Sequence, residues 1–109
     1  MSKMSTPLVS IIIPTYNRRG WIGECLDSVK EQTYPHIETL VIDDCSTDGT
    51  VEWLRESPNY TFAQVHVQLQ NGGASVARNT GIRIARGDLQ PIHLREGDHE
   101  RSELRRIHR

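Results

Sequence analysis

The sequence predicts an α/β fold in which buried strands alternate with amphipathic helices. Three short segments rich in β-branched or alternating apolar residues lie at 8–13, 37–42 and 62–69, and a segment with helical spacing of apolar residues follows each of them. Because strands that alternate with helices are joined by right-handed crossovers, the sheet is expected to be mainly parallel, with helices on its faces.

The first strand and the first helix are the best defined. The sequence LVSIII at 8–13 is apolar apart from one serine, which suits a strand buried on both faces, and Pro14 is expected to stop it. The segment 19–33 then has apolar residues at spacings of three and four with charged residues between them, which predicts an amphipathic helix. The apolar face comprises Trp21, Ile22, Cys25, Leu26 and Val29.

The second and third units repeat this pattern. IETLVI at 37–42 is a second apolar run, and a helical pattern in VEWLRES follows it and ends before Pro58. Three residues before that pattern are candidate helix caps: Ser46, Thr47 and Asp48. FAQVHVQL at 62–69 alternates apolar and polar side chains, and NGGASVARNTGIRIA then predicts a glycine-bearing turn into a third helix.

Length, charge and cysteine content exclude several classes of protein. A chain of 109 residues with a net charge of −1 is one small domain, with no global reason to bind nucleic acid or an anionic membrane. No apolar run approaches the ~18 residues of a membrane span, and no signal peptide is recognisable. Cys25 and Cys45 lack a metal-ligand spacing and are expected to be reduced thiols, which predicts a cytoplasmic location.

Three polar loops are expected to meet at one edge of this sheet. The segments PTYNR (14–18), DDCSTDG (43–49) and QNGGAS (70–75) each follow a predicted strand. In α/β sheets the working site lies beyond the carboxyl ends of the strands. The sequence therefore predicts a functional site made from these three loops.

Asp43 and Asp44 are the first candidates for this site. Successive side chains of a strand point to opposite faces, so one carboxylate is expected to face a ligand and the other to hold a loop or a helix. A carboxylate only accepts hydrogen bonds, which selects a ligand with an N–H or O–H donor, such as the imide of uracil or a ribose hydroxyl, and disfavours a bare phosphate. The residues alone leave an acid-rich structural turn equally open.

Other residues could meet the remaining parts of such a ligand. Gly72 and Gly73 precede a helix whose amino-terminal dipole could hold phosphate, and Arg78 on that helix could reach it. Tyr16 could stack on a base. Each feature also has an ordinary structural interpretation, namely a turn, an ion-paired arginine and a partly buried tyrosine.

Taken together, these segments resemble a known enzyme family. VSIIIPTYNRRGWIGECLDSVKEQTYPHIETLVIDDCSTDGT, followed by NGGASVARNTGIRIARGD, resembles the amino-terminal half of family 2 glycosyltransferases, the inverting enzymes of the GT-A fold. The resemblance covers about residues 8–88 and rests on the order and spacing of PTYNR, QTYP, the strand ending in DDCSTDGT, and ARNTG. It implies a three-layer α/β/α Rossmann-like sheet, incomplete in this chain.

The resemblance also implies a ligand, a nucleotide diphosphate sugar that is commonly the uridine form. In the family pattern Tyr16 stacks near the base, Asp44 accepts a hydrogen bond from the uracil imide, and Asp43 supports the loop. The other residues that the resemblance places at the nucleotide pocket are Pro14, Thr15, Asn71, Gly72, Gly73 and Arg78.

The metal site and the catalytic base of this family are not recognisable in the chain. The family displaces the leaving diphosphate directly at the anomeric carbon, with a carboxylate as base and Mn²⁺ or Mg²⁺ held by an Asp-x-Asp motif after ARGD. Here LQPIHLREGDHE follows Asp88, so Pro91 is expected to interrupt a fourth strand, and only Glu96 and Asp98 could replace the motif. We therefore identify no catalytic residue, and we expect this chain not to bind the metal.

The resemblance divides the chain into three parts. These are a flexible segment at 1–7, a partial nucleotide-sugar-binding domain at 8–88, and a divergent charged tail at 89–109. The abrupt change suggests a truncated or frame-shifted product that is inactive alone and self-associates through an exposed sheet edge. Two alternatives stay open: a non-catalytic nucleotide-binding or interaction module, and a receiver-like signalling domain with an acid pocket.

Overall fold

The computed structural model describes residues 7–91 of the 109-residue chain. Its centre is a four-stranded parallel sheet in the order β3-β2-β1-β4. The strands are β1 (Val9–Thr15), β2 (Ile37–Asp43), β3 (Ala63–Val67) and β4 (Asp88–Pro91). The helices are α1 (Arg19–Lys30), α2 (Thr50–Glu56), the short 3-10 helix η1 (Pro58–Tyr60) and α3 (Ala74–Ile84).

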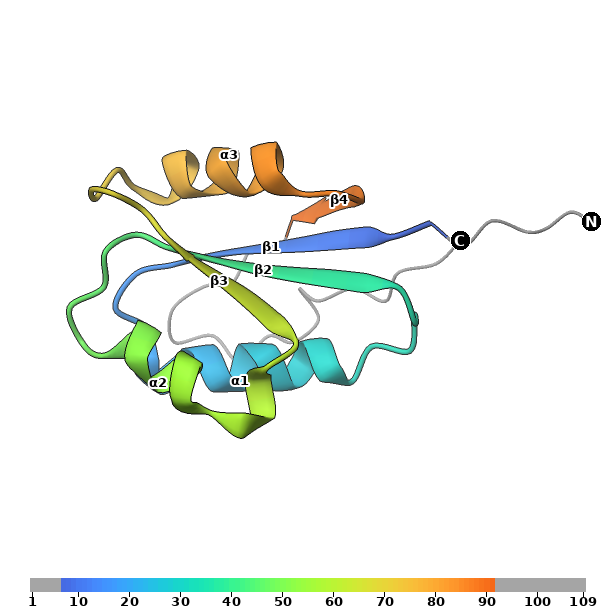
Figure 1. The fold of residues 1–109 in the computed structure, drawn as a ribbon, viewed down its shortest axis with the longest axis horizontal. Coiled ribbons are helices and arrows are strands. Elements are labelled where there is room, and N and C mark those ends of the chain that lie inside the picture. The colour runs from blue at the N-terminus through green and yellow to red at the C-terminus, as the bar shows by residue number, and fades with distance from the viewer. Residues whose placement is uncertain (1–6, 92–109) are drawn as a thin grey trace, which may run out of the picture.

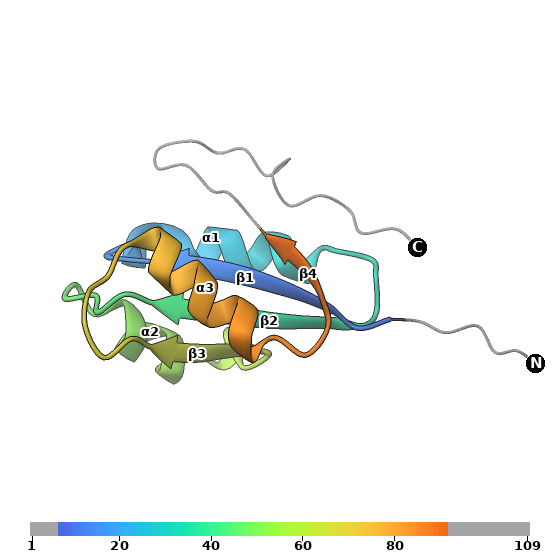
Figure 2. The same cartoon turned by 90° about the horizontal axis from the view of Figure 1, so that it is seen from above.

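The helices form a layer on each face of the sheet. Figure 1 shows α1 and α2 below the sheet and α3 above it. Figure 2, viewed from above, shows α3 lying over the sheet. The carboxyl ends of β1 and β2 point toward the left of Figure 1, where the loops that leave the strands gather. This alternation of parallel strands and covering helices confirms the predicted α/β class.

Burial of both faces of β1 explains why its sequence is almost entirely apolar. Val9, Ile11 and Ile13 belong to the core that packs with α1 and α2. Ile12 belongs to a second, smaller core under α3. The helix approaches the strand so closely that a Cβ on Gly81 would lie 2.4 Å from Cγ2 of Ile12. Any side chain at position 81 would therefore push α3 away from the sheet.

Pro14 does not end the first strand as expected, because β1 continues through Thr15. The backbone N–H of Asp44 donates to the carbonyl of Thr15 at 2.9 Å, so the polar groups of Thr15 point toward β2. Since these groups alternate sides along a strand, those of Pro14 point away from β2. The N–H that Pro14 lacks would therefore not take part in the ladder with β2, and this ladder continues to Thr15↔Asp43.

A fourth strand forms at the end of the described residues. β4 pairs with β1 in parallel from Val9↔Asp88 to Ile12↔Pro91. The interruption expected at Pro91 and the domain boundary expected at residue 88 stay predictions. The predicted tail beyond residue 91, which includes Glu96 and Asp98, lies outside the described residues.

A buried carboxylate fastens the amino end of the sheet. Glu38 on β2 is 8% exposed and accepts hydrogen bonds from Ser10 Oγ at 2.6 Å and from the Arg86 backbone N–H at 2.9 Å. The Arg86 Nε lies 3.4 Å from its other oxygen, and Gln64 Nε2 donates to that oxygen at 3.5 Å. The Gly87 N–H in turn donates to Ser10 Oγ at 2.9 Å. This cluster joins β1, β2, β3 and the segment entering β4.

β3 lies at one edge of the sheet and leaves apolar side chains exposed. Phe62 is 39% exposed, Val67 is 42% exposed, and Leu69 just beyond the strand is fully exposed. An unpaired strand edge with apolar neighbours can template association with another chain. Self-association through this edge stays a prediction.

The described helices are short. The longest, α1, has 12 residues, whereas a membrane span needs about 20. Within residues 7–91 no helix is long and apolar enough to cross a membrane.

Candidate functional site

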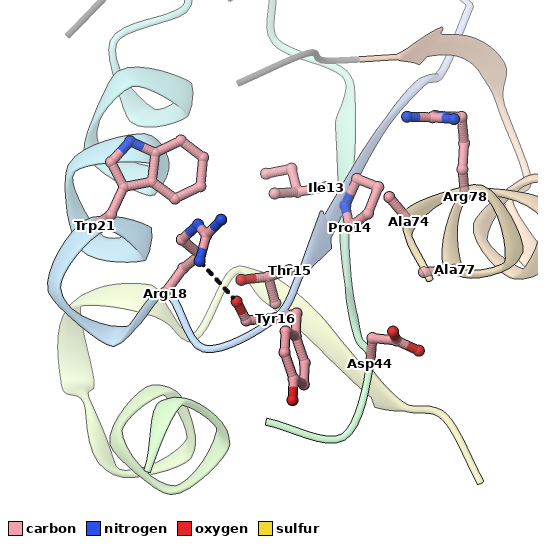
Figure 3. Close-up of a pocket in the computed structure, with 10 residues that line it drawn as sticks. All are labelled: Ile13, Pro14, Thr15, Tyr16, Arg18, Trp21, Asp44, Ala74, Ala77 and Arg78. Atoms are coloured by element: carbon pink, nitrogen blue, oxygen red, sulfur yellow. Dashed lines mark hydrogen bonds between the residues drawn. The ribbon is translucent and has the colours of Figure 1, made fainter. Parts of the chain in front are cut away.

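A pocket of about 200 Å³ opens at the carboxyl end of β1, between α1 and α3. Figure 3 shows its walls, which come from the end of β1, the start of α1, the end of β2 and the first turns of α3. It is smaller than the roughly 300–1,000 Å³ of a drug-sized ligand site, so it suits one ring system better than a whole nucleotide sugar. The lining residues are Ile13, Pro14, Thr15, Tyr16, Arg18, Trp21, Asp44, Ala74, Ala77 and Arg78.

Two polar atoms of this lining are buried without a hydrogen-bond partner among the residues that the structure describes. They are the hydroxyl Oγ1 of Thr15, a residue that is 4% exposed, and the Nε of Arg78. Buried polar groups in folded proteins almost always have partners, so an unpartnered pair beside a cavity is a reason to expect a polar ligand. Both atoms can donate a hydrogen bond.

Asp44 ties the pocket to the loop before α3. One of its carboxylate oxygens accepts from the Gly72 N–H at 2.9 Å and the other accepts from the Gly73 N–H at 2.8 Å. The Asn71 amide donates to the Asp44 carbonyl at 3.1 Å. These glycine N–H groups, considered above for a phosphate, are directed at Asp44 instead. A carboxylate has about four acceptor positions, so Asp44 retains capacity for a ligand.

Asp43 lies on the other side of the strand end and does not line the pocket. It is fully buried and accepts from the Ser46 backbone N–H at 2.8 Å and from the Ser46 hydroxyl at 2.6 Å. The two adjacent carboxylates therefore hold different loops, as alternation along a strand requires. Asp43 fastens the loop between β2 and α2, and Asp44 fastens the loop between β3 and α3.

Tyr16 is the exposed aromatic residue of the lining. Tyr16 is 43% exposed, and Figure 3 shows its ring at the pocket wall. Arg18 Nη1 donates to the Tyr16 carbonyl at 3.1 Å, drawn as the dashed line in Figure 3. The ring thus presents a free face at the site while its backbone is held.

Asp48 joins the starts of two helices. It accepts from the Arg19 N–H at 3.1 Å at the start of α1, and from the N–H at 3.1 Å and the hydroxyl of Thr50 at the start of α2. Burial raises the pKa of Asp48, but these hydrogen bonds outweigh it and hold the pKa below its usual value. Such an acid at helix amino ends also interacts favourably with the helix dipoles.

The structure brings together five of the nine residues predicted to bind nucleotide. Pro14, Thr15, Tyr16, Asp44 and Arg78 line the pocket. The other four, which support the lining from behind, are Asp43, Asn71, Gly72 and Gly73.

Sequence reasoning missed half of the pocket lining. Trp21 was assigned only to the apolar face of a helix, and Ala74 and Ala77 carry no chemical signal that could have marked them. Arg18 belongs to the PTYNR segment, so its position next to the strand end was a usable signal.

No metal centre forms in the described part of the chain. Among residues 7–91 no three His, Cys, Asp or Glu side chains lie together in a way that could hold a metal ion. The described residues therefore do not fit a metal, and we derive no chemical step through one.

The fold and the site define an α/β domain with a polar pocket at the carboxyl end of its sheet. The family model described as Glycosyl transferase family 2 matches residues 10–92. The match covers most of the chain, so the chain belongs to this family. Family membership confirms the resemblance seen in the sequence and leaves the receiver-like alternative without support.

Individual relatives agree with this assignment. The glycosyltransferase AglE of Haloferax volcanii is 43% identical over 86 residues, which are 76% of this chain and 28% of AglE. The solved mannosyltransferase PcManGT from Pyrobaculum calidifontis, in complex with GDP-Man and Mn²⁺, is 36% identical with a TM-score of 0.68 over 76% of this chain and 26% of its own. The S. aureus TarS structure in complex with UDP-GlcNAc is 34% identical with a TM-score of 0.70, over 78% and 26% of the two chains.

These proteins are much longer than the matched region. The chain spans less than a third of the length of the curated relatives it matches, for example 32% of one and 24% of another. Over the matched region, the similarity establishes the family and the GT-A fold.

Proposed function

We propose that residues 7–91 form the nucleotide-binding part of a family 2 glycosyltransferase and that the pocket holds the base of a nucleotide diphosphate sugar. The observation that carries this proposal is the pocket lining, in which an exposed tyrosine and an acceptor carboxylate lie with two donors that have no partner among residues 7–91, Thr15 Oγ1 and Arg78 Nε. The solved relatives bound to UDP-GlcNAc and to GDP-Man support a ligand of this class.

Each lining group has a chemical task in this proposal. The exposed face of Tyr16 stacks on the base. Asp44 accepts from a ring N–H, which the imide of uracil provides. Arg78 and Thr15 donate to oxygen atoms of the base, ribose or diphosphate, which completes their hydrogen bonding. Because Asp44 is an acceptor, the phosphates are expected to lie away from it and toward a cationic side chain.

The transfer reaction itself is not assigned to these residues. In the family reaction an acceptor hydroxyl must lose a proton while the sugar leaves the diphosphate. Asp43 and Asp44 are both occupied with hydrogen bonds to the chain, so we assign neither as the base. We propose that the described residues bind the donor without catalysing its transfer, and that they hold no Mn²⁺ or Mg²⁺.

The test is calorimetric titration of the 109-residue chain with uridine, guanosine and thymidine diphosphates, each with and without Mn²⁺. We expect UDP to bind with unchanged affinity when Mn²⁺ is added. The variant Asp44→Ala should bind at least tenfold more weakly, because a charge-assisted hydrogen bond is worth about 1.5–3 kcal/mol. Absence of binding by all three nucleotides, or equal binding by the variant, would contradict the proposal.

A matched control separates the pocket from the rest of the domain. Glu38→Gln changes a buried carboxylate at the opposite end of the sheet, next to neither Tyr16 nor Asp44. Folded Glu38→Gln protein should bind UDP like the wild type. If it loses as much affinity as Asp44→Ala, the loss reflects general destabilisation.

A further inference from the structure

A chain of hydrogen bonds connects the loop after β1 with the loop after β2. The Asn17 backbone N–H donates to Ser46 Oγ at 2.7 Å. The Asn17 side-chain oxygen accepts from the Thr47 backbone N–H at 2.7 Å. Ser46 Oγ in turn donates to Asp43 at 2.6 Å. We call Asp43, Ser46, Asn17 and Thr47 the loop clamp.

The direction of these bonds is fixed by the buried acid. A serine hydroxyl has a single proton, and Ser46 uses it to donate a hydrogen bond to the carboxylate oxygen of Asp43. The lone pairs of Ser46 Oγ are thereby left for the N–H of Asn17. Since Asp43 is fully buried and also accepts from the Ser46 N–H, the hydroxyl has one favoured orientation.

The clamp acts on the peptide unit that follows Tyr16. The N–H of this peptide belongs to Asn17 and is bound by Ser46 Oγ, while its carbonyl belongs to Tyr16 and accepts from Arg18 at 3.1 Å. Asn17 adopts the left-handed conformation, with φ of 52°, which asparagine tolerates better than most residues. Both polar groups of the peptide are thus held at the turn from which the ring of Tyr16 projects.

We propose that Ser46 and Asn17 are positioning residues that fix the ring of Tyr16 in the orientation needed to stack on a nucleoside base. This inference rests on the proposed function of the pocket. Neither residue lines the pocket itself. The clamp makes the exposed ring depend on Asp43, the carboxylate that has no direct access to a ligand.

A second tie between the same two loops provides a comparison. Asp48 accepts from the Arg19 N–H at 3.1 Å, two residues beyond the clamped peptide and at the start of α1. Loss of this bond should loosen the loops without releasing the peptide after Tyr16. Asp48→Ala therefore reports what general loosening of the loops does to binding.

The experiment measures the dissociation constant for UDP and the melting temperature of the 109-residue chain and its variants. Ser46→Ala should weaken UDP binding about fivefold, the value of one ordinary hydrogen bond, and Ser46→Thr should restore it by keeping the hydroxyl. Asn17→Gly, which keeps the left-handed backbone but removes the acceptor, should weaken binding similarly, and Asn17→Asp should restore it. Thr47→Ala should weaken binding less than Ser46→Ala, because it keeps the 2.7 Å backbone bond to Asn17 and removes only the 3.4 Å bond from the Thr47 hydroxyl.

The decisive comparison uses Tyr16→Ala as a background. If the clamp acts through the ring, Ser46→Ala should cause no further loss of UDP affinity once the ring is absent. An additional fivefold loss of UDP affinity in that background would overturn the proposal. It would also be overturned if Asp48→Ala and Ser46→Ala lowered the melting temperature equally and also weakened UDP binding equally. If Ser46→Ala does not fold, the same comparison is made with Asn17→Gly.

The two proposals fail in different ways. If wild-type protein binds no nucleoside diphosphate, the proposed function of the pocket is wrong. If wild-type protein binds UDP and both Ser46→Ala and Asn17→Gly bind it equally well, only the positioning role is wrong.

Discussion

Each end of the sheet carries buried acidic residues on β2 or directly after it, but the two ends use them differently. At the amino end, Glu38 is surrounded by donors from three other segments and lines no part of the site pocket. At the carboxyl end, Asp43 and Asp44 are also hydrogen-bonded, yet Thr15 Oγ1 and Arg78 Nε, in the pocket that Asp44 lines, have no partner in the described part of the chain.

This difference separates folding from binding. A polar cluster whose members satisfy one another contributes to stability and offers nothing to a ligand. A cluster that leaves donors unsatisfied next to a cavity is less favourable for the free protein and gains when a ligand supplies the acceptors. Changes at the two ends should therefore affect different measurements, stability at one end and affinity at the other.

The largest effect is expected from Glu38→Ala. Removal of the carboxylate leaves the Ser10 hydroxyl and the Arg86 N–H without their buried acceptor. Loss of charge-assisted buried hydrogen bonds should lower the free energy of unfolding by about 3 kcal/mol. Urea denaturation measures this change, and a midpoint equal to that of the wild type would show that the amino-end cluster does not stabilise the sheet.

Arg78→Ala should lower UDP affinity and leave the free energy of unfolding almost unchanged. Its Nε has no partner among the described residues, so the free energy of unfolding should change by less than about 0.5 kcal/mol. UDP affinity should fall by roughly 10- to 100-fold, because a charged hydrogen bond to the ligand is lost. Calorimetry and urea denaturation on the same protein check both values, and a large loss of stability with unchanged affinity would reverse the assignment.

The acid dependence of stability should trace to the amino end. Burial raises the pKa of Glu38, but the hydrogen bonds from Ser10 and the Arg86 N–H, together with the Arg86 charge, outweigh it and lower the pKa from its usual 4.5. The ionised form is therefore favoured by folding, so its contribution is present above pH 4.5 and is lost as the pH falls through the folded pKa.

A comparison of wild type with Glu38→Gln tests this linkage. Between pH 5.5 and 3, the wild type should lose on the order of 1 kcal/mol more stability than the variant, which has no carboxyl to protonate at this position. Parallel stability curves for the two proteins would assign the acid sensitivity to other groups, Asp48 being the next candidate.

The smallest effect concerns the reactivity of two thiols. Both cysteines are free, as the sequence predicted. Burial, and then the charge of Glu24, raises the pKa of Cys25 to about 12, whereas Cys45 is partly exposed in the loop after β2. An aromatic disulfide reagent at pH 8 should therefore modify one thiol per folded chain, and Cys45→Ser should abolish this reaction. Two reacting thiols in the folded protein would show that the α1 core opens readily.

Local patterns were sufficient to predict the first three strands, the three α-helices and their order. The apolar run of β1 and the helical spacing of α1 reflect burial, and burial can be recognised from the pattern of neighbouring residues in the sequence. The prediction that Pro14 ends the first strand was wrong, because the N–H that this proline lacks would point away from β2 and the pairing with β2 continues past it.

The contacts that build the site could be predicted only in part. Alternation along a strand indicated that Asp43 and Asp44 would have separate roles. It could not show that Asp44 meets the N–H groups of Gly72 and Gly73, or that Ser46 meets Asn17, because these pairs are brought together only by the register of the sheet and the path of the loops.

The most direct test of the central claim is a titration of ¹⁵N-labelled protein with UDP, followed by the amide resonances at the two ends of the sheet. The amides of Gly72 and Gly73, which donate to Asp44, should shift with UDP concentration along with that of Thr15 in the pocket lining. The amides of Arg86 and Gly87, which donate into the Glu38 cluster, should stay in place. Shifts confined to Arg86 and Gly87, or no shifts at saturating UDP, would contradict the assignment of the carboxyl end as the nucleotide site.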